Sequence, residues 1–230
     1  TTPPGETIGN PRYYATAVTF GGYAQPVLGE THEGRPTKLE GLADHPACLG
    51  GSSPFVQAAL LDLYDPDRSR APLSDGQPTT WAAFDTAMVE NARRLDAVKG
   101  QGFRLLLSAS SSPTLARQLE EFSTRWPLAR WHAFEPVNAD QRMEAARLMF
   151  GRPLEVAYHL DACSVIASFD ADLLGPGPHQ VTHGRAWSAR RAAFHDGDGD
   201  CRLLVVEPAP TLTGAMAADR LIASPRQVET

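Results

Sequence analysis

Cysteine is scarce in this sequence of 230 residues. The three cysteines, Cys48, Cys163 and Cys201, lie far apart and form no C-x-x-C pair. Zinc ribbons, iron–sulfur runs and dithiol redox motifs need closely spaced cysteines. The spacing therefore argues against all three kinds of site, and at most one disulfide could form.

Long apolar runs and basic clusters are missing as well. The longest apolar runs, such as Phe103 to Leu107, are far shorter than the roughly 20 residues that span a bilayer. The formal charge is -6 and the sequence pI is near 5.6, whereas binding to phosphates needs a clustered excess of Lys and Arg. We therefore expect no direct membrane insertion and no nucleic-acid partner.

Three motifs of common enzymes are absent. The sequence contains neither a G-x-G-x-x-G dinucleotide motif nor a P-loop, and it has no G-x-S-x-G nucleophile elbow. The chain also begins at Thr1 without a basic stretch followed by an apolar core, so either a signal was removed or the chain is an excised fragment. We expect the fragment.

The first part of the chain is rich in Pro and Gly and predicts a small, loop-rich β lobe. Short β-type runs occupy Tyr13–Phe20 and Val27–Thr31, with a reversal at Glu33-Gly34. One helix is predicted over Pro54–Tyr64, and Ala71–Pro78 is typical of a linker. The apolar face of that helix is predicted to comprise Phe55, Ala58, Ala59, Leu61 and Leu63.

After residue 79 the pattern alternates between helix and strand. Helices are predicted to begin after Thr80 and Ser112, which are plausible N-caps, and near Asn138, with Gly151 ending the last of them. Four apolar runs have strand length: Phe103–Ser108, Trp131–Phe134, Val165–Phe169 and Leu203–Val206. Such alternation predicts an α/β fold, with a Rossmann-like, mainly parallel sheet flanked by helices. We expect two domains, residues 1–78 and 79–230.

Polar residues follow two of the predicted strands, where parallel sheets place their ligand sites. The loop Ser108–Ser112 could offer hydroxyls and helix amides to an anion, although its serines are equally suited to cap a helix. Asp170 and Asp172 follow the third strand and are interpreted as solvated turn residues, because no glycine there allows close backbone approach.

Two further patterns suggest metal ligands. Asp196, Asp198, Asp200 and Glu207 match four positions of a calcium-binding EF-hand loop, but Cys201 replaces its turn glycine and the next residues have the pattern of a strand. We interpret this run, which follows His195, as an Asp/Gly turn. The other pair, His179 and His183, could share a metal if that stretch were helical, yet no third ligand is identifiable.

One stretch is more specific than the others. The run HEGRPTKLEGLADHP from His32 to Pro46, followed by YDPDR at Tyr64–Arg68, resembles the N-terminal lobe of the molybdopterin-dependent oxidoreductase superfamily. The later segments VVEP at Val205–Pro208 and TLTGAMA at Thr211–Ala217 resemble the Rossmann-like part of the same superfamily. The resemblance extends from about Tyr13 to Leu221.

The chain departs from that family where a redox centre is expected. Catalytic members carry three cysteines ahead of the glycine of their GR motif, whereas Tyr13–Glu33 contains none, and Ser53 stands near the place of the usual fourth. A neutral hydroxyl is a poor ligand for an iron–sulfur cluster, and Cys48 alone cannot hold one. The resemblance thus implies no catalytic, cofactor-binding or metal residue in this chain, and a chain that is not catalytic by itself.

This combination is similar to one branch, the iron–sulfur subunit of bacterial alternative complex III, a membrane-bound quinol:acceptor oxidoreductase. The resemblance implies a cofactor-free scaffold whose partners are the other subunits of a respiratory complex and a ferredoxin-like domain. Iron–sulfur clusters are then expected in a missing part of the parent protein, which a twin-arginine route would export to the periplasmic side of the inner membrane.

Under this hypothesis Gly34-Arg35 and Asp65–Arg68 are structural, and Asp67 and Arg68 are candidates for turn and ion-pair roles. Two alternatives remain: a stand-alone oxidoreductase domain that binds a nucleotide or pterin through Ser108–Ser112, and a calcium-binding module.

Overall fold

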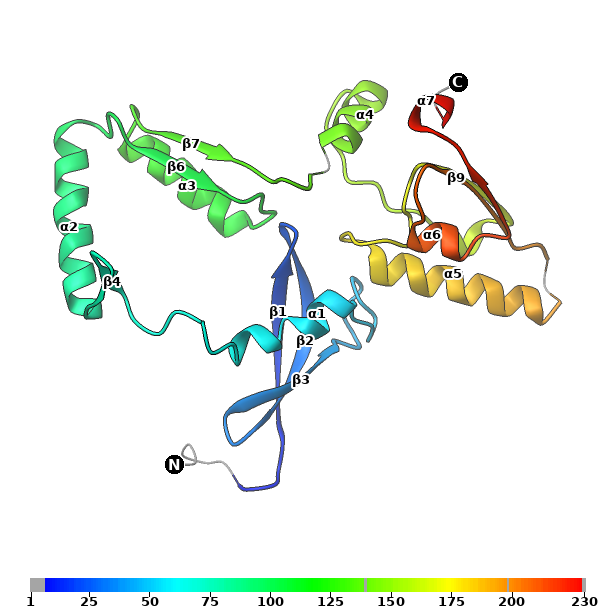
Figure 1. Cartoon of the computed structure of the whole chain (residues 1–230), viewed down its shortest axis with the longest axis horizontal. Helices are drawn as coiled ribbons and strands as arrows, with labels where there is room; N and C mark the ends of the chain where they lie inside the picture. Colours follow the sequence, from blue (N-terminus) through cyan, green and yellow to red (C-terminus); the bar gives the residue numbers. More distant parts are fainter. Residues whose placement is uncertain (1–6, 139, 198, 229–230) are drawn as a thin grey trace. The chain divides into compact units, whose positions relative to one another are not determined.

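The computed structural model describes residues 7–138, 140–197 and 199–228, and it has an α/β fold (Figure 1). Contacts group the chain into two compact units. The first consists of Thr1–Val18, Ala24–Gln57 and Ala139–Thr230, and the second of Thr19–Tyr23 and Ala58–Asn138. The expected domain boundary at residues 78 and 79 stays a prediction.

The N-terminal sheet is antiparallel, with strands β1 (Arg12–Phe20), β2 (Tyr23–His32) and β3 (Arg35–Gly41) in that order. Glu33 and Gly34 both have positive φ, 51° and 76°. A two-residue hairpin turn whose twist matches that of its strands requires positive φ at both positions. The predicted reversal is therefore confirmed. Val27 is fully buried, and the alternate burial along β2 gives this sheet its inner face.

The helix predicted over Pro54–Tyr64 is wrong in length and in orientation. Helix α1 ends at Ala58 (Pro54–Ala58), and a short 3-10 helix, η1, covers Leu61–Leu63. Val56 is the buried residue of α1, whereas Phe55, Leu61 and Leu63 of the predicted apolar face are exposed.

The prediction of an unstructured linker over Ala71–Pro78 needs correction, because this segment contains a small hairpin of β4 (Leu73–Ser74) and β5 (Gln77–Pro78). Its turn is Asp75-Gly76, and both residues have positive φ. An Asp-Gly pair is a strong hairpin signal, but the flanking strands are only two residues long, so they carry no alternating pattern.

The second unit has helix α2 (Trp81–Ala97), strand β6 (Arg104–Leu107), helix α3 (Pro113–Arg125) and strand β7 (Arg130–Ala133). Both predicted N-caps are confirmed: the hydroxyl of Thr80 accepts from the Ala83 amide at 3.2 Å, and that of Ser112 from the Leu115 amide at 3.3 Å. Strands β6 and β7 pair in parallel, and α3 is the crossover between them.

A small aromatic cluster and one carboxylate hold the helices of this unit. Phe103, Phe122 and Trp126 have ring centroids 5.5 to 5.7 Å apart. Asp96 at the end of α2 accepts two hydrogen bonds from Arg125 and one from the indole of Trp126. The ends of α2 and α3 are therefore joined by polar contacts.

The first unit continues with α4 (Asp140–Phe150), which Gly151 ends with φ of 76° as predicted. Then follow the 3-10 helix η2 (Leu160–Ala162), β8 (Val165–Phe169), α5 (Gln180–His195), β9 (Arg202–Glu207), α6 (Leu212–Ala215), β10 (Asp219–Ile222) and α7 (Pro225–Val228). Strands β10, β9 and β8 form a parallel sheet in that order. The parallel strands of the described residues therefore lie in two sheets.

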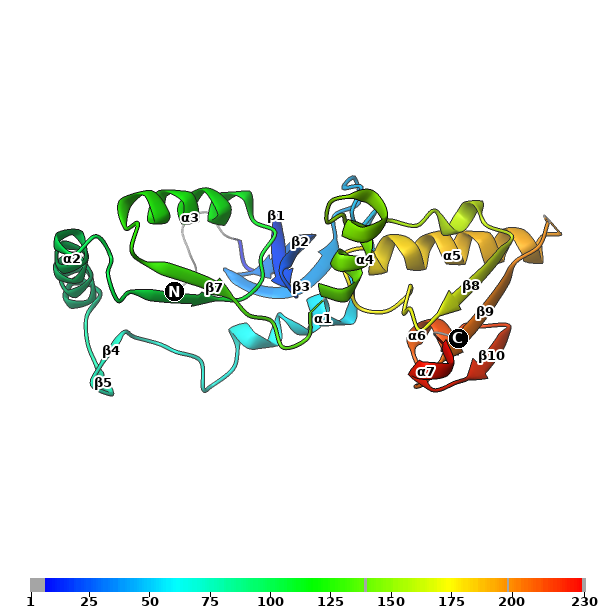
Figure 2. The ribbon, with the colours of Figure 1, turned by 90° about the horizontal axis from the view of Figure 1, so that it is seen from above.

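Helix α5 runs beside the sheet of β8 and β9 (Figure 2). Its Trp187 forms one core cluster with Leu160, Leu203 and Val205, each at most 4% exposed. The cluster packs α5 against β9, the central strand of the sheet. The loops that follow β8 and β9 therefore begin at strands that a buried core holds in place.

Candidate functional site

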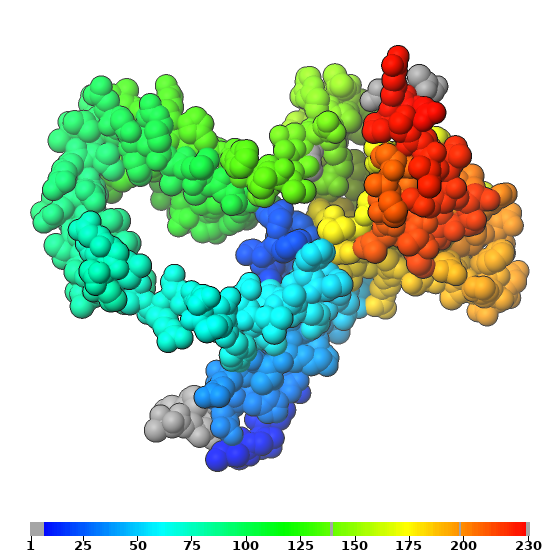
Figure 3. Space-filling model, viewed as in Figure 1, coloured from blue at the N-terminus to red at the C-terminus, as the bar shows by residue number. Residues whose placement is uncertain are grey.

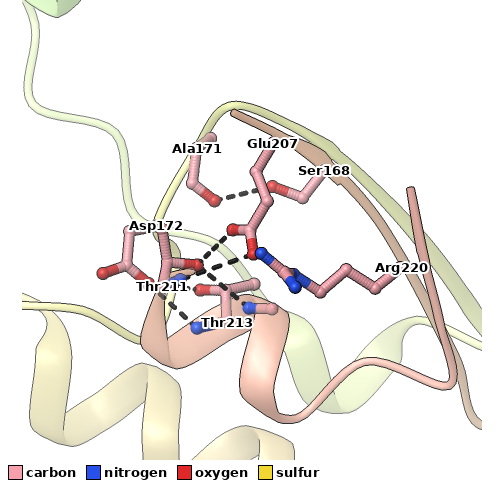
Figure 4. Close-up of polar contacts among 8 residues, drawn as sticks. Ser168, Ala171, Asp172, Glu207, Thr211, Thr213 and Arg220 are labelled. Atoms are coloured by element: carbon pink, nitrogen blue, oxygen red, sulfur yellow. Dashed lines mark hydrogen bonds and ion pairs between the residues drawn. The ribbon is translucent and has the colours of Figure 1, made fainter. Parts of the chain in front are cut away.

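A hydrogen-bonded group of polar side chains lies after the carboxyl ends of β8 and β9. Asp172 follows β8, Glu207 is the last residue of β9, and α6 begins shortly after it. Carboxyl ends of neighbouring parallel strands meet at one edge of a sheet, which is where α/β folds place ligands. We call Asp172, Glu207, Thr211, Thr213 and Arg220 the edge network (Figure 4).

Glu207 is the buried centre of the edge network, with 1% of its surface exposed. The Thr211 hydroxyl donates to its Oε2 at 2.6 Å, and Nε of Arg220 donates to its Oε1 at 2.5 Å. The Thr211 hydrogen bond is the main cause that lowers the pKa of Glu207; burial opposes this effect and Arg220 adds to it. Glu207 is therefore a carboxylate at neutral pH.

Asp172 binds the start of α6. Its Oδ1 accepts from the Thr213 backbone amide at 3.0 Å and from the Thr213 hydroxyl at 2.7 Å. The same hydroxyl accepts from the Leu174 amide at 2.9 Å, so the loop after β8 is fastened to α6 by three hydrogen bonds. Asp172 is exposed, as predicted for a turn residue, but its bonds to Thr213 were not predicted.

Two glycines make room for these carboxylates. A Cβ at Gly175 would collide with the carboxylate of Asp172, and a Cβ at Gly214 would collide with that of Glu207. Neither glycine has a positive φ, so the backbone conformation does not require glycine there. The reason for glycine at both positions is the close approach of a carboxylate to the backbone. The carboxylates of Asp172 and Glu207 thus lie close against the backbone of their own chain at these two glycines.

The chemistry open to this network is limited. Its donors and acceptors bind one another, and no group of three His, Cys, Asp or Glu residues able to hold a metal occurs among the described residues. The arrangement can hold α6 and β10 at the edge of the sheet.

The EF-hand pattern is not assembled in space. Glu207 lies at the end of β9, whereas Asp196 and Asp200 precede the start of that strand. Asp198 lies outside the described residues. Asp196 is the C-cap of α5 and Gly197 has φ of 86°, which agrees with an Asp/Gly turn. Because the Glu207 carboxylate is bound by Thr211 and Arg220, it is not available as the ligand at position twelve of a calcium-binding loop.

His179 and His183 lie one turn apart, but His183 is engaged on both ring nitrogens. Its Nε2 is 3.0 Å from the Tyr158 amide nitrogen and its Nδ1 is 3.0 Å from the Leu173 carbonyl oxygen. A metal would need one of these lone pairs. Burial is the main cause that lowers the pKa of His183, so the ring is neutral at pH 7.

The Ser108–Ser112 loop borders a pocket of about 570 Å³ beside α3. Glu120 is the one charged residue of its lining, and no Lys or Arg lines it; the rest is apolar or Ser. Ser112 caps α3, and Ser110 accepts from the Ser112 amide at 3.2 Å, as expected for serines that start a helix. An acidic wall disfavours phosphates, so this pocket does not support the nucleotide alternative. Its other lining residues are Leu107, Ser108, Ala109, Leu115, Ala116, Leu119, Ser123, Trp131 and Ala133.

The positions that the resemblance assigns to cluster ligands do not fit a cluster. Ser53 is 2% exposed; its hydroxyl donates to the Gln25 side-chain oxygen at 3.1 Å and accepts from the Val56 amide. Cys48 is buried, and its thiol donates to the Leu42 carbonyl at 3.1 Å. A hydroxyl and one internally bonded thiol are not the thiolate set that iron–sulfur clusters require.

The predicted turn residues act differently from their expected roles. In the segment Asp65–Arg68, the carboxylate of Asp65, not of Asp67, accepts from the Asp67 amide at 2.8 Å. Arg68 donates to the Leu63 carbonyl at 3.3 Å. Arg68 therefore links η1 to the turn that follows it through a backbone group.

Comparison with known proteins places the fold only. No protein-family model matches the chain, and neither does any curated protein. Among solved structures, acetylene hydratase from Pelobacter acetylenicus is similar, with a TM-score of 0.55 and 16% identity over 86% of this chain. The likeness shows that this chain shares a fold with part of that enzyme. The chain spans 27% of the length of that structure.

Proposed function

We propose that this chain is a cofactor-free, molybdopterin-oxidoreductase-like scaffold segment of a membrane-associated respiratory complex that oxidises quinol. Its role is to offer packing surface to other subunits and to a ferredoxin-like domain on the periplasmic side of the membrane. The iron–sulfur clusters belong to other parts of that assembly. The observation that carries the proposal is the amount and kind of surface that the chain leaves uncovered.

The accessible surface is larger than compact domains of this size expose. A compact protein of 24.8 kDa exposes about 10,000 Å², and two separate compact domains of the sizes of the two units about 12,000 Å² together. The chain exposes 16,206 Å². The excess, on the order of 4,000 Å² on this one chain, exceeds the roughly 1,000–2,500 Å² that each partner contributes to a large permanent interface, so it is enough for more than one partner.

Helix α2 shows what kind of surface this is. None of its 17 residues is buried, and Trp81, Phe84 and Met88, which share one face, are 68%, 40% and 45% exposed. Figure 3 shows this helix at the left edge of the view. An apolar stripe at helical spacing normally faces a core. We call these three residues the α2 stripe.

The parallel sheet of the first unit is likewise covered on one face only. Trp187 covers the face of Leu203 and Val205, while Phe169 and Leu221 pair with Val206 on the other face and are 61% and 62% exposed. Parallel sheets of stable proteins are covered on both faces. The uncovered face therefore supports the proposal that a neighbouring subunit packs on it and supplies the second layer.

The proposal assigns the membrane association of the complex to its other parts. Within residues 7–138, 140–197 and 199–228, no helix combines the length and hydropathy needed to cross a bilayer. The donor set around Ser53 and Cys48 supports a segment without a cluster.

The experiment is to tag the chain in its host, solubilise the membranes in mild detergent and separate the native complexes. The proposal expects the chain in a large assembly that contains iron and oxidises quinol. The variant Met88→Lys on the α2 stripe should release it, whereas Glu90→Lys, which changes the opposite face of α2, should not. Recovery of the chain only as a free species, or with stoichiometric iron of its own, contradicts the proposal.

A further inference from the structure

His183 of α5 is a buried histidine whose two ring nitrogens both meet backbone groups. The side chain is in the core, with 6% of the residue exposed. The amide N–H of Tyr158 can only donate, so Nε2 must be the bare, accepting nitrogen. The carbonyl of Leu173 can only accept, so Nδ1 must carry the hydrogen. The surroundings therefore fix one neutral tautomer.

This ring joins three segments of the first unit. Leu173 lies in the loop after β8, His183 lies on α5, and Tyr158 lies in the connection between α4 and η2. The ring of Tyr158 packs on the imidazole with centroids 5.5 Å apart. In the same connection Glu155 forms an ion pair with Arg142 of α4, at 3.1 Å. The connection is thus held at one end by α4 and at the other by His183, and the Glu155 carboxylate also lies 4.0 Å from Nε2 of His179 at the start of α5.

We propose that His183 is a pH-sensitive latch that fastens the connection at Tyr158 to α5 at neutral pH and releases it in acid. Protonation places a hydrogen on Nε2, which then points at the N–H of Tyr158, so an acceptor becomes a second donor. The bond from Nδ1 to the Leu173 carbonyl survives, because a protonated ring still donates there. Release is therefore local: the loop after β8 stays on α5 and Leu160 stays packed on Trp187, while the Tyr158 amide loses its acceptor.

The charged groups around the ring set the pH at which this happens. Burial lowers the pKa of His183 most and His179 lowers it further, while the Leu173 hydrogen bond and Glu155 raise it. Asp161 of η2 is exposed, and Asp172 beside Leu173 is held by Thr213. The folded pKa thus lies below the value of about 6.5 of a free histidine. Above about pH 6.5 the bond from the Tyr158 amide to His183 is therefore formed, and it is lost as the pH falls through the folded pKa of His183.

The test is hydrogen exchange of the Tyr158 amide in the whole chain at pH 7.5 and pH 5.0, with each rate divided by its intrinsic rate. Loss of one buried hydrogen bond should reduce the protection of Tyr158 about fivefold or more in acid. The variant His183→Gln can still accept from Tyr158 but does not titrate, so its protection should be independent of pH. His195→Gln, at an exposed histidine, should behave like the unchanged chain.

A second measurement keeps the inference testable if the Gln variant is poorly folded. The ring nitrogens of His183, followed by NMR, should show the Nδ1–H tautomer at pH 7.5 and titrate with the same midpoint as the Tyr158 protection. Unchanged protection of Tyr158 at a pH where NMR shows His183 protonated, or the other tautomer, overturns the latch. An equal loss of protection in β9 also overturns it, because it would reveal general unfolding.

Discussion

Replacing Gly214 by Ala should destabilise the first unit, although the same change in an open helix stabilises. Gly214 lies in α6, and Ala is favoured over Gly in helices by about 0.5–1 kcal/mol. Gly184 in α5 is the matched control, because its added Cβ would meet open space. The two substitutions are chemically identical, and only what the new methyl group meets differs between them.

The magnitude follows from the fixed position of Glu207. The methyl group that Gly214→Ala introduces would collide with the carboxylate of Glu207, and that carboxylate cannot swing aside without losing Thr211 and Arg220. Overpacking of this kind costs about 1–3 kcal/mol, so the net effect of Gly214→Ala is a destabilisation of roughly 1–2 kcal/mol. Gly184→Ala should stabilise by about 0.5–1 kcal/mol.

Unfolding of this unit can be followed separately, by hydrogen exchange of β9 peptides across a urea series. With a urea dependence of about 2 kcal/mol per molar, the midpoint should fall by roughly 0.5–1 M for Gly214→Ala and rise by about 0.3–0.5 M for Gly184→Ala. In a Glu207→Ala background the Gly214→Ala penalty should vanish. Two shifts of the same sign, or a penalty that persists without Glu207, would refute the collision.

Three further outcomes are expected from the same measurements. Thr211→Val removes the N-cap of α6 and a donor to Glu207 and should cost about 1 kcal/mol, while Thr211→Ser should cost little. The folded pKa of Glu207 is lowered, so the stability that Glu207 contributes should be present above about pH 4.5 and should be lost as the pH falls through the folded pKa. Arg220→Met should make this acid-dependent loss of stability smaller, and the same acid profile in the variant and the unchanged chain would contradict the prediction. Ser112→Ala should destabilise α3 by about 1 kcal/mol and Ser111→Ala by much less, as judged from exchange of the first α3 amides.

Features that depend on neighbouring residues could be predicted from the sequence. The Glu33-Gly34 turn and the Thr80 and Ser112 caps each rest on contacts within a few residues, and the structure confirms all three. The α/β class also followed from the alternation of apolar runs and helical spacing. These signals are local, so no knowledge of the tertiary structure was needed.

The edge network could not be predicted, because its partners are far apart in sequence. Asp172 meets Thr213 and Glu207 meets Arg220 only after β8, β9 and β10 have paired. Spacing alone even suggested a calcium ligand at Glu207. An Asp, a Thr or an Arg in isolation carries no sign of the loop it will bind.

Helix α5 was missed for a different reason. Its buried residues include His183, a polar side chain, and its interior contains Gly184, so neither hydrophobic periodicity nor helix propensity marks it. The signal that could have found it is the separation of two strands that must pair in parallel, which requires a crossover between Phe169 and Arg202.

The parallel sheet of the first unit also has a consequence for synthesis on the ribosome. Val165 pairs with Arg202, so β8 leaves the exit tunnel well before its partner exists, whereas Leu204 and Asp219 of β9 and β10 emerge close together. Closing the long loop costs more entropy than closing the short one. The pair β9 and β10 should therefore form first and β8 join last, which leaves an apolar strand exposed on the nascent chain and makes it a natural target for chaperones.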